Sequence, residues 1–376
     1  MEDLLIKRLN RPINGNRSAV ALDAKAVFAT SVGLVRKENE DRAIVARFYS
    51  YNLKSFVHCY VLSDGMGGMV NGGLAASITV ATFLTKLEET IDSSSSIESA
   101  IRNATTEAHK KVCGELNYKG GATLSAIISH TPGELYIVNI GDSRIYQCSS
   151  SNAMLQITED DDIKSFLQKY RGIEVNDVLA QRNGLTKFIG MEGDLHFEIE
   201  LCSSTSDFFI ISDGIGLIGK DNLEGLYENR TSESEFLQRC IHLSNWLGGK
   251  DNATGIYVSL SEIETSNYME DSNINYVEMW DFHGNLLFPR KKVEKPTEQE
   301  KAHKEPLPEK KSAKKQSRKK KTSSAKLIVD GEDVEIESVQ EPLFSFEEQP
   351  SEDSENSQST EPKEPSTTEI KTDKKD

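Results

Sequence analysis

The segment VHCYVLSDGMGG at residues 57–68, with GGLAASITVATFLTKLEETI following at residues 72–91, decides the fold of this chain. Its first part is rich in β-branched and aromatic residues, which predicts a strand that ends at Asp64. Its second part carries apolar residues at helical spacing among good helix formers, which predicts a helix. The glycine-rich turn between the two places a carboxylate where a strand gives way to a helix.

Further strands and helices are predicted on both sides of this segment. A second helix is expected at 96–116 and a late one at 233–247. The segments typical of strands are AVFATSVGLV (26–35), RAIVARFY (42–49), ATLSAIISHT (122–131), ELYIVNIGDSRIYQCS (134–149), HFEIELCS (196–203), DFFIISDG (207–214) and ATGIYVSLSEI (253–263). Strands, two helices, more strands and one late helix indicate an α+β sandwich rather than a regular βαβ repeat.

The composition of the chain changes near residue 289. Residues 290–376 hold 7 of the 10 prolines but 1 of the 25 glycines and 2 aromatic residues. A segment so poor in apolar side chains cannot bury a core, so we expect a disordered tail. The expected organisation is a flexible lead-in or edge element at 1–25, a folded domain at 26–262, a peripheral extension at 263–289 and the tail at 290–376.

Charge and patterning argue against several classes of protein. The 60 acidic and 44 basic residues give a formal charge of −16, of which −14 belongs to residues 1–289 with their 39 acidic and 25 basic residues. This acidic balance disfavours a domain that binds nucleic acid or anionic lipid. No run approaches the roughly 18 apolar residues of a transmembrane segment, and residues 1–20 lack an apolar stretch of signal-peptide length. Five cysteines without a CxxC pair indicate buried thiols in a reducing compartment. We therefore expect a cytoplasmic protein.

Four aspartates stand at the ends of apolar strand segments, namely Asp64, Asp142, Asp213 and Asp251. Burying an isolated carboxylate is costly, and several carboxylates held close together repel one another. A divalent cation removes that cost, and Mg²⁺ or Mn²⁺ prefers oxygen ligands of this kind. One aspartate at a strand end is more often a turn residue than a ligand, but four in this arrangement favour a metal site.

The glycines after Asp64 also allow an interpretation as a phosphate-binding loop. A dinucleotide fingerprint requires GxGxxG, whereas residues 65–70 read GMGGMV, and the Walker spacing is absent. The glycines are better explained by a backbone that passes close to a metal ion, with the Gly65 carbonyl available as a ligand.

Six motifs together resemble the metal-dependent PP2C-type (PPM) serine/threonine protein phosphatases. They are GLVRKENEDR (33–42), SDGMGG (63–68), GATLSAII (121–128), NIGDSRIY (139–146), SDGI (212–215) and DNAT (251–254). With methionine at position 66, the chain resembles the bacterial branch of this family. The resemblance implies an α+β fold, a four-layer α-β-β-α sandwich of two antiparallel sheets. It also implies hydrolysis of phosphoserine and phosphothreonine on protein substrates, by a metal-bridged hydroxide that attacks phosphorus in line.

The resemblance implies a role for each matched residue. Asp64 bridges two Mn²⁺ or Mg²⁺ ions, the Gly65 carbonyl binds one of them, and Asp213 and Asp251 complete the other site. Asp142 joins Asp213 at a third, weaker site found in bacterial members. Glu40 and Asp41 hold metal-bound waters, and Arg36 clamps the phosphate through its guanidinium fork. Arg36, Asp64 and Asp213 are thus the expected catalytic residues.

Some features depart from the family pattern or leave alternatives open. Ile215, Gly216 and Leu217 stand where polar residues are usual, and the segment 158–190, which shapes substrate access, has a composition of its own. Met66 provides no proton donor, so a water at the metals is the expected general acid, and His58 and His109 are expected to be structural. A non-catalytic phosphoprotein-binding scaffold is the alternative function.

The tail has two blocks of opposite charge. Residues 290–326 contain 15 basic and 5 acidic residues, whereas residues 327–376 contain 4 basic and 16 acidic residues. The basic block is interpreted either as a solvated linker or as a patch for an acidic partner, and LFSF at 343–346 as a protein-binding motif. LIVDGEDVEI (327–336) could form a small hairpin. The expected partners are phosphorylated protein substrates and a paired Ser/Thr kinase.

Overall fold

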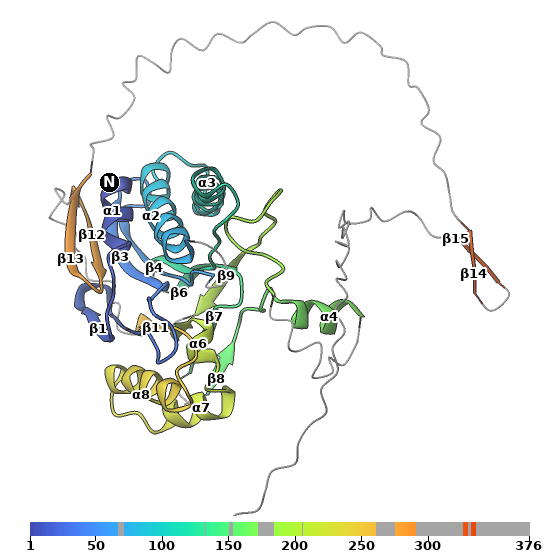
Figure 1. The fold of residues 1–376 in the computed structure, drawn as a ribbon. Helices are drawn as coiled ribbons and strands as arrows, with labels where there is room; N and C mark the ends of the chain where they lie inside the picture. The colour runs from blue at the N-terminus through green and yellow to red at the C-terminus, as the bar shows by residue number, and fades with distance from the viewer. Residues whose placement is uncertain are drawn as a thin grey trace, which may run out of the picture. The chain divides into compact units, whose positions relative to one another are not determined.

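Two antiparallel sheets form the centre of the protein (Figure 1). The computed structural model describes residues 1–66, 71–131, 133–149, 153–171, 184–204, 206–260, 275–290, 326–329 and 332–335. The first sheet has the order β1-β2-β11-β10-β7-β8 and the second the order β13-β12-β3-β4-β5-β6-β9. Their strands are β1 (Asn16–Ala21), β2 (Ala26–Ser31), β3 (Arg42–Ser50), β4 (Ser55–Ser63), β5 (Leu124–Thr131), β6 (Gly133–Ile140), β7 (Arg144–Cys148), β8 (Met154–Gln156), β9 (Ile199–Ser204), β10 (Asp207–Ile211), β11 (Ala253–Val258), β12 (Tyr276–Asp281) and β13 (Gly284–Pro289).

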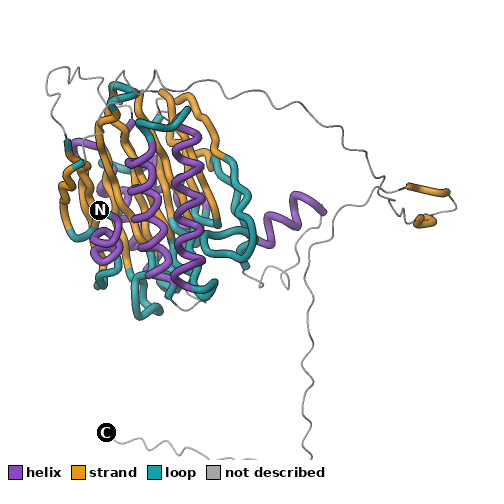
Figure 2. Tube along the Cα trace, turned by 90° about the horizontal axis from the view of Figure 1, so that it is seen from above, coloured by secondary structure: helices purple, strands orange, loops and turns teal. Residues whose placement is uncertain are grey.

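Helices cover the outer face of each sheet. The helices are α1 (Glu2–Leu9), α2 (Gly72–Thr90), α3 (Ile97–Leu116), α4 (Ile163–Arg171), α6 (Asp213–Gly216), α7 (Lys220–Glu228) and α8 (Glu233–Trp246), with a 3₁₀ turn, η1, at Leu22–Ala24. Figure 1 shows α2 and α3 on one side of the strands and α7 and α8 on the other. Figure 2 shows α2 and α3 side by side over the strands. The expected four-layer α-β-β-α sandwich is confirmed.

Three apolar layers hold these four layers together. One lies between the first three helices and the second sheet and includes Ile44, Val61 and Phe83. The middle layer, between the two sheets, includes Phe28, Tyr60 and Phe208. The third lies between the first sheet and α7 and α8. Because strands β3 and β4 are buried on both faces, their sequences are nearly continuous apolar runs, which is why they read clearly as strands.

The two ends of the domain are more ordered than composition indicated. Leu5 and Leu9 of α1 are buried against the second sheet and its helices, and β1 pairs along its whole length with β2 as an edge strand. Of the two expectations for residues 1–25, the edge element agrees with strand β1 at the edge of the first sheet. The extension is a hairpin, β12–β13, that adds to the second sheet beside β3. Arg8 joins α1 to this hairpin, since its guanidinium binds the buried Asp281 carboxylate through two nitrogens at 2.6 and 2.9 Å.

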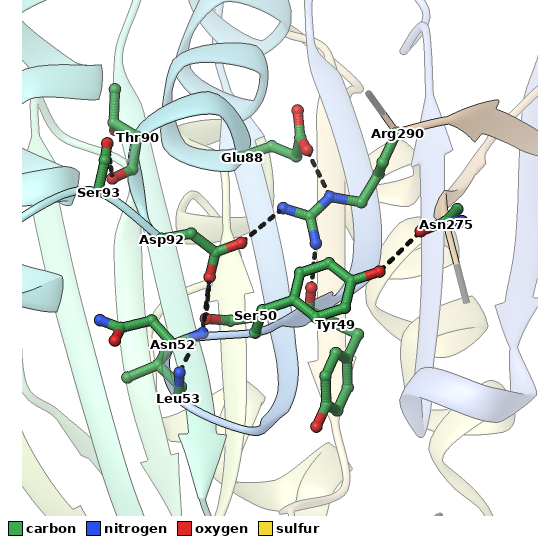
Figure 3. Close-up of polar contacts among 11 residues, drawn as sticks. Tyr49, Ser50, Asn52, Leu53, Glu88, Thr90, Asp92, Ser93, Asn275 and Arg290 are labelled. Atoms are coloured by element: carbon green, nitrogen blue, oxygen red, sulfur yellow. Dashed lines mark hydrogen bonds and ion pairs between the residues drawn. The ribbon is translucent and has the colours of Figure 1, made fainter. Parts of the chain in front are cut away.

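Arg290 closes the domain at the end of this hairpin (Figure 3). Its side chain is 4% exposed and forms ion pairs with Glu88 at 2.5 Å and Asp92 at 3.2 Å. It also donates a hydrogen bond to the Tyr49 carbonyl. Composition placed Arg290 at the start of the tail. Because its guanidinium is buried between the end of α2 and strand β3, it belongs to the folded domain.

The chain divides into a unit of residues 1–295 and a unit of residues 296–376. Within the second unit the structure describes one antiparallel hairpin, β14 (Lys326–Val329) with β15 (Glu332–Glu335), at the position where the sequence allowed one. The basic run and LFSF lie outside the described residues. Among the helices that the structure describes, none is both long enough and apolar enough to cross a membrane.

Candidate metal centre

The strand-end aspartates gather at one place between the two sheets. Asp64 follows β4, Asp213 follows β10 as the first residue of α6, and Asp251 precedes β11, which pairs with β10. Asp41 directly precedes β3. Each of Asp41, Asp142, Asp213 and Asp251 acts electrostatically on Asp64. The structure therefore brings together carboxylates that are up to 210 residues apart in the chain.

The pKa values of these carboxyl groups are raised, with burial as the main cause. Burial and the neighbouring carboxylates raise the pKa of Asp64 well above its usual range. Burial raises the pKa of Asp213 to about 7, with Asp142 and Asp251 adding to the effect. Burial also raises the pKa of Asp41 and of Asp142 to about 6. Buried like charges of this kind call for a compensating cation.

Two carboxylate oxygens at this place are buried without a hydrogen-bond partner. They are Oδ1 of Asp41 and Oδ1 of Asp213. The other Asp41 oxygen accepts a hydrogen bond from the Ser212 hydroxyl at 2.9 Å. Buried polar atoms almost always have a hydrogen-bond partner. Two carboxylate oxygens without one, next to further carboxylates, therefore indicate a place for a cation that prefers oxygen ligands. The donor set thus fits hard divalent cations such as Mn²⁺ or Mg²⁺.

Asp64 and Gly65 are positioned by the segment before β5. The Asp64 N–H donates to the Thr123 hydroxyl at 2.9 Å, and the Thr123 N–H donates to the Asp64 carbonyl at 2.8 Å. Gly65 must be glycine, because a Cβ there would lie 2.4 Å from the carbonyl carbon of Gly72. The turn can therefore pass tightly against the start of α2.

Asp251 lies beside the expected phosphate clamp. Arg36 Nη2 donates to Asp251 Oδ2 at 2.6 Å, and this hydrogen bond is the main cause that raises the pKa of Arg36. The other Asp251 oxygen accepts from the Asn252 N–H at 2.8 Å. Each Asp251 oxygen thus has a protein partner. Among the described residues, no three acidic, histidine or cysteine side chains are grouped so that they could hold one metal ion.

A buried arginine and an asparagine hold the acidic loop before β3. The Arg42 guanidinium donates to the carbonyls of Asn39 and Asp41 at 2.7 and 2.8 Å, and burial lowers its pKa to about 10. Asn252 accepts from the Glu40 N–H at 2.8 Å. The Glu40 carboxylate accepts from the Gly73 N–H at the start of α2, and burial raises its pKa. Glu40 and Asp41 thus face the site from a braced loop.

Asp142 lies where the segment 158–190 joins the site. The neighbouring Gly141 exchanges backbone and side-chain hydrogen bonds with Asp161. Arg144, two residues further on, holds Asp160 through two nitrogens at 2.7 to 3.0 Å. After burial, the Asp142 carboxylate is the largest cause that raises the pKa of Asp213.

His58 and His109 have structural positions, as expected from the sequence. His58 is buried within β4, opposite Arg47. His109 of α3 accepts from the Gly190 N–H at 3.2 Å and so holds the end of the segment 158–190. Residues 67–70 of the glycine loop lie outside the described residues.

Sequence reasoning missed the residues that position the ligands. These are Asn39, Arg42, Thr123, Ser212, Asn252 and Thr254. Each lies next to a quoted motif or within it, but only their contacts across the sheets show what they do. A polar residue adjacent to a strand-end aspartate is the signal that could have identified several of them.

A sandwich that gathers buried carboxylates and an arginine between its sheets defines a metal-dependent class of phosphoryl-group hydrolase. A family model described as Protein phosphatase 2C matches residues 41–254. The chain therefore belongs to the protein phosphatase 2C family, as its motifs indicated, and its enzyme class is that of the serine/threonine protein phosphatases.

Individual relatives agree with this assignment. A putative protein phosphatase 2C-type from Streptococcus pyogenes is 28% identical over 247 residues, which cover 61% of this chain and 95% of that protein. The serine/threonine protein phosphatase PstP of Mycobacterium tuberculosis is 27% identical over 62% of this chain, and the match spans 44% of PstP. The solved structure of the serine/threonine phosphatase Stp1 from Staphylococcus aureus has a TM-score of 0.53 and 23% identity, covering 66% of this chain and 97% of Stp1, which shows a shared fold.

Proposed function

We propose that the protein hydrolyses phosphoserine and phosphothreonine on protein substrates with the help of two Mn²⁺ or Mg²⁺ ions. One observation carries this proposal: buried carboxylates from four strand ends meet with two orphaned oxygens, on Asp41 and Asp213, beside Arg36. Family membership supports the same reaction. The sequence relative PstP has a catalytic-domain structure in complex with two manganese ions.

In this proposal Asp64, the Gly65 carbonyl, Asp213 and Asp251 would hold the two cations. Asp142 joins Asp213 at a third, weaker position. Glu40 and Asp41 orient waters from the loop that Arg42 and Asn252 brace. Cations held by these residues would supply Lewis-acid chemistry, which lowers the pKa of a water so that it can act as the in-line nucleophile towards phosphorus.

Arg36 has two tasks in this site. In the structure its guanidinium contacts Asp251, with the side chain 34% exposed. A cation at Asp251 would compensate the charge that Arg36 now compensates, and the guanidinium fork could then hold two phosphate oxygens. Glu40 and Asp213 also act electrostatically on the Arg36 guanidinium.

The leaving serine or threonine oxygen must receive a proton. Among the described residues of the loop after Asp64 no side chain titrates. His58 is buried within β4, and His109 accepts a hydrogen bond from the Gly190 N–H. We infer that a water held at the site supplies this proton.

The test is hydrolysis of p-nitrophenyl phosphate and a phosphothreonine peptide with added Mn²⁺. We expect EDTA or Asp64→Asn to abolish turnover. Asp64→Asn should also weaken Mn²⁺ binding measured by calorimetry, which does not depend on turnover. Asp92→Asn is the matched control, because Asp92 is a buried carboxylate beyond the opposite end of α2. Metal-independent turnover, or full activity of Asp64→Asn, would refute the proposed mechanism. Metal binding and phosphopeptide binding without turnover would favour the non-catalytic scaffold instead.

The partners beyond the substrate remain predictions. A paired Ser/Thr kinase, an acidic or protein partner of the tail and a cytoplasmic location rest on the sequence arguments above. A pull-down with a peptide of residues 338–350, compared with its scrambled version, tests the LFSF motif.

A further inference from the structure

Large apolar side chains are exposed beside Arg36 and Asp251. Trp246 is 81% exposed, Leu34 70%, Val35 66% and Leu247 46%. We call these four residues the apolar rim. Exposing a tryptophan and three aliphatic side chains together is costly in water, and such patches on a soluble domain often mark an interaction site.

The two halves of the apolar rim form one surface. The Leu34 and Val35 N–H groups both donate to the Gly249 carbonyl, at 2.7 and 3.2 Å. A Cβ at Gly249, whose φ is +50°, would lie 2.8 Å from Cγ of Leu34. Glycine at this position therefore allows the Leu34 side chain to lie on the turn that carries Trp246 and Leu247.

This surface is continuous with the site. Val35 directly precedes Arg36, the turn of Trp246 leads into Asp251, and the two ends meet in the 2.6 Å contact of Arg36 with Asp251. Exposed Lys37 and Lys250 follow Arg36 and precede Asp251. A phosphate bound at Arg36 would thus have both apolar and basic surface next to it.

We propose that the apolar rim binds large apolar residues that flank the phosphorylated residue of a protein substrate. This proposal rests on the proposed function, since it takes Arg36 as the point where the phosphate binds. An extended peptide advances roughly 3.3 Å per residue, and Val35 is bonded to Arg36. The residues next to the phosphoserine are therefore the ones that reach the rim, while the basic neighbours favour the negatively charged phosphopeptide.

Binding is measured without turnover by the fluorescence of Trp246. The chain has two tryptophans, and Trp280→Phe leaves Trp246 as the sole reporter. The probes are two dodecapeptides with the phosphonate analogue of phosphoserine, flanked by leucines in one and by serines in the other. We expect the leucine peptide to shift Trp246 emission to the blue and to protect it from iodide quenching, and the serine peptide to do neither. Equal effects of the two peptides, or a blue shift that grows with protein concentration without peptide, would overturn the proposal. The second result would identify another copy of the chain as the occupant.

Turnover gives a second, independent measurement. With phosphoserine versions of both peptides, we expect kcat/KM to favour the leucine peptide by about tenfold, the range of a buried aromatic contact. Trp246→Ala and Leu34→Ser should bring this ratio close to one. Leu287→Ser on β13, with a similarly exposed leucine, is the matched control and should keep the ratio. A ratio that stays unchanged in Trp246→Ala would refute the role of the rim. If neither peptide nor p-nitrophenyl phosphate is hydrolysed by the unaltered protein, the proposed function fails, while the fluorescence result still decides the rim.

Discussion

Replacement of Arg290 by methionine should destabilise the domain strongly while leaving its chemistry intact. The methionine keeps most of the apolar stem but removes the guanidinium that pairs with Glu88 and Asp92 (Figure 3). The guanidinium also lies over the Phe48 and Tyr51 rings, and this contact is lost as well. These two carboxylates are only 15% and 9% exposed. The substitution therefore leaves two nearly buried charges without their cation.

The expected loss follows from this burial. Breaking a buried ion pair by removing one partner costs roughly 3–5 kcal/mol. Asp92 keeps hydrogen bonds from the Ser50 hydroxyl at 2.6 Å and the Asn52 N–H at 3.1 Å, so we expect the lower end, about 3 kcal/mol. For a domain of this size that loss lowers Tm by roughly 6–12 °C.

Urea unfolding followed by circular dichroism measures this loss on the full chain. Lys110→Met is the control, because Lys110 is 65% exposed and its pair with Glu107 contributes little. The triple variant Glu88→Gln, Asp92→Asn, Arg290→Met should recover part of the stability, since no charge is left uncompensated. Hydrolysis of p-nitrophenyl phosphate should persist, because α2 separates the cluster from Gly72 by about 28 Å. A loss below about 1 kcal/mol for Arg290→Met, or a triple variant less stable than the single one, would refute the reasoning.

Three other substitutions test the site and the core. Arg36→Ala should lower kcat/KM about 100-fold with little change in the urea midpoint, because this pair is partly exposed; unchanged kinetics would exclude a clamp. Gly214→Ala should cost about 3 kcal/mol or more in unfolding free energy, since its Cβ would lie 1.9 Å from the Asn252 carbonyl oxygen, whereas Gly225→Ala, which meets open space, should be neutral or stabilising; equal effects would contradict this. Burial, together with Arg47, lowers the pKa of His58 to about 4. Its unfolded pKa is about 6.5, so between these values only the unfolded chain takes up the proton. At pH 4.5 this uptake should remove about 2.5 kcal/mol of the stability present at pH 7, and His58→Gln should lose less over the same range in urea midpoints; an identical loss would show that His58 is not responsible.

Several parts of the fold could be predicted because they are local. The segment 57–91 forms β4 and α2 at the expected positions, since continuous apolar runs and helical spacing are visible in any short window. The ends of the domain were harder. Residues 2–9 form a helix through two leucines that are buried by distant elements, and composition contains no record of those contacts.

The residues of the site also divide into those that the sequence indicates and those that only their contacts in the structure reveal. Asp64, Asp213 and Asp251 could be picked out because burying a lone carboxylate at the end of an apolar strand costs free energy unless a cation or another group compensates its charge. Asn252 and Arg42 could not, because an asparagine or arginine in a polar loop has many ordinary explanations. What distinguishes them is burial and the carbonyls and amides that they meet from other strands.

The amino-acid sequence was enough to predict the class of this protein, its α+β order of elements and the strand-end aspartates that are proposed as metal ligands. These properties depend on side-chain chemistry and on neighbours within a few residues, which the chain displays directly. The tertiary structure was needed to show which carboxylate oxygens have no hydrogen-bond partner and which groups brace the acidic loop before β3. It also shows that Leu34 lies on the turn of Trp246. Those contacts depend on the pairing of strands far apart in the chain. The free energy of a contact depends on both residues, so neither residue by itself shows it in the sequence.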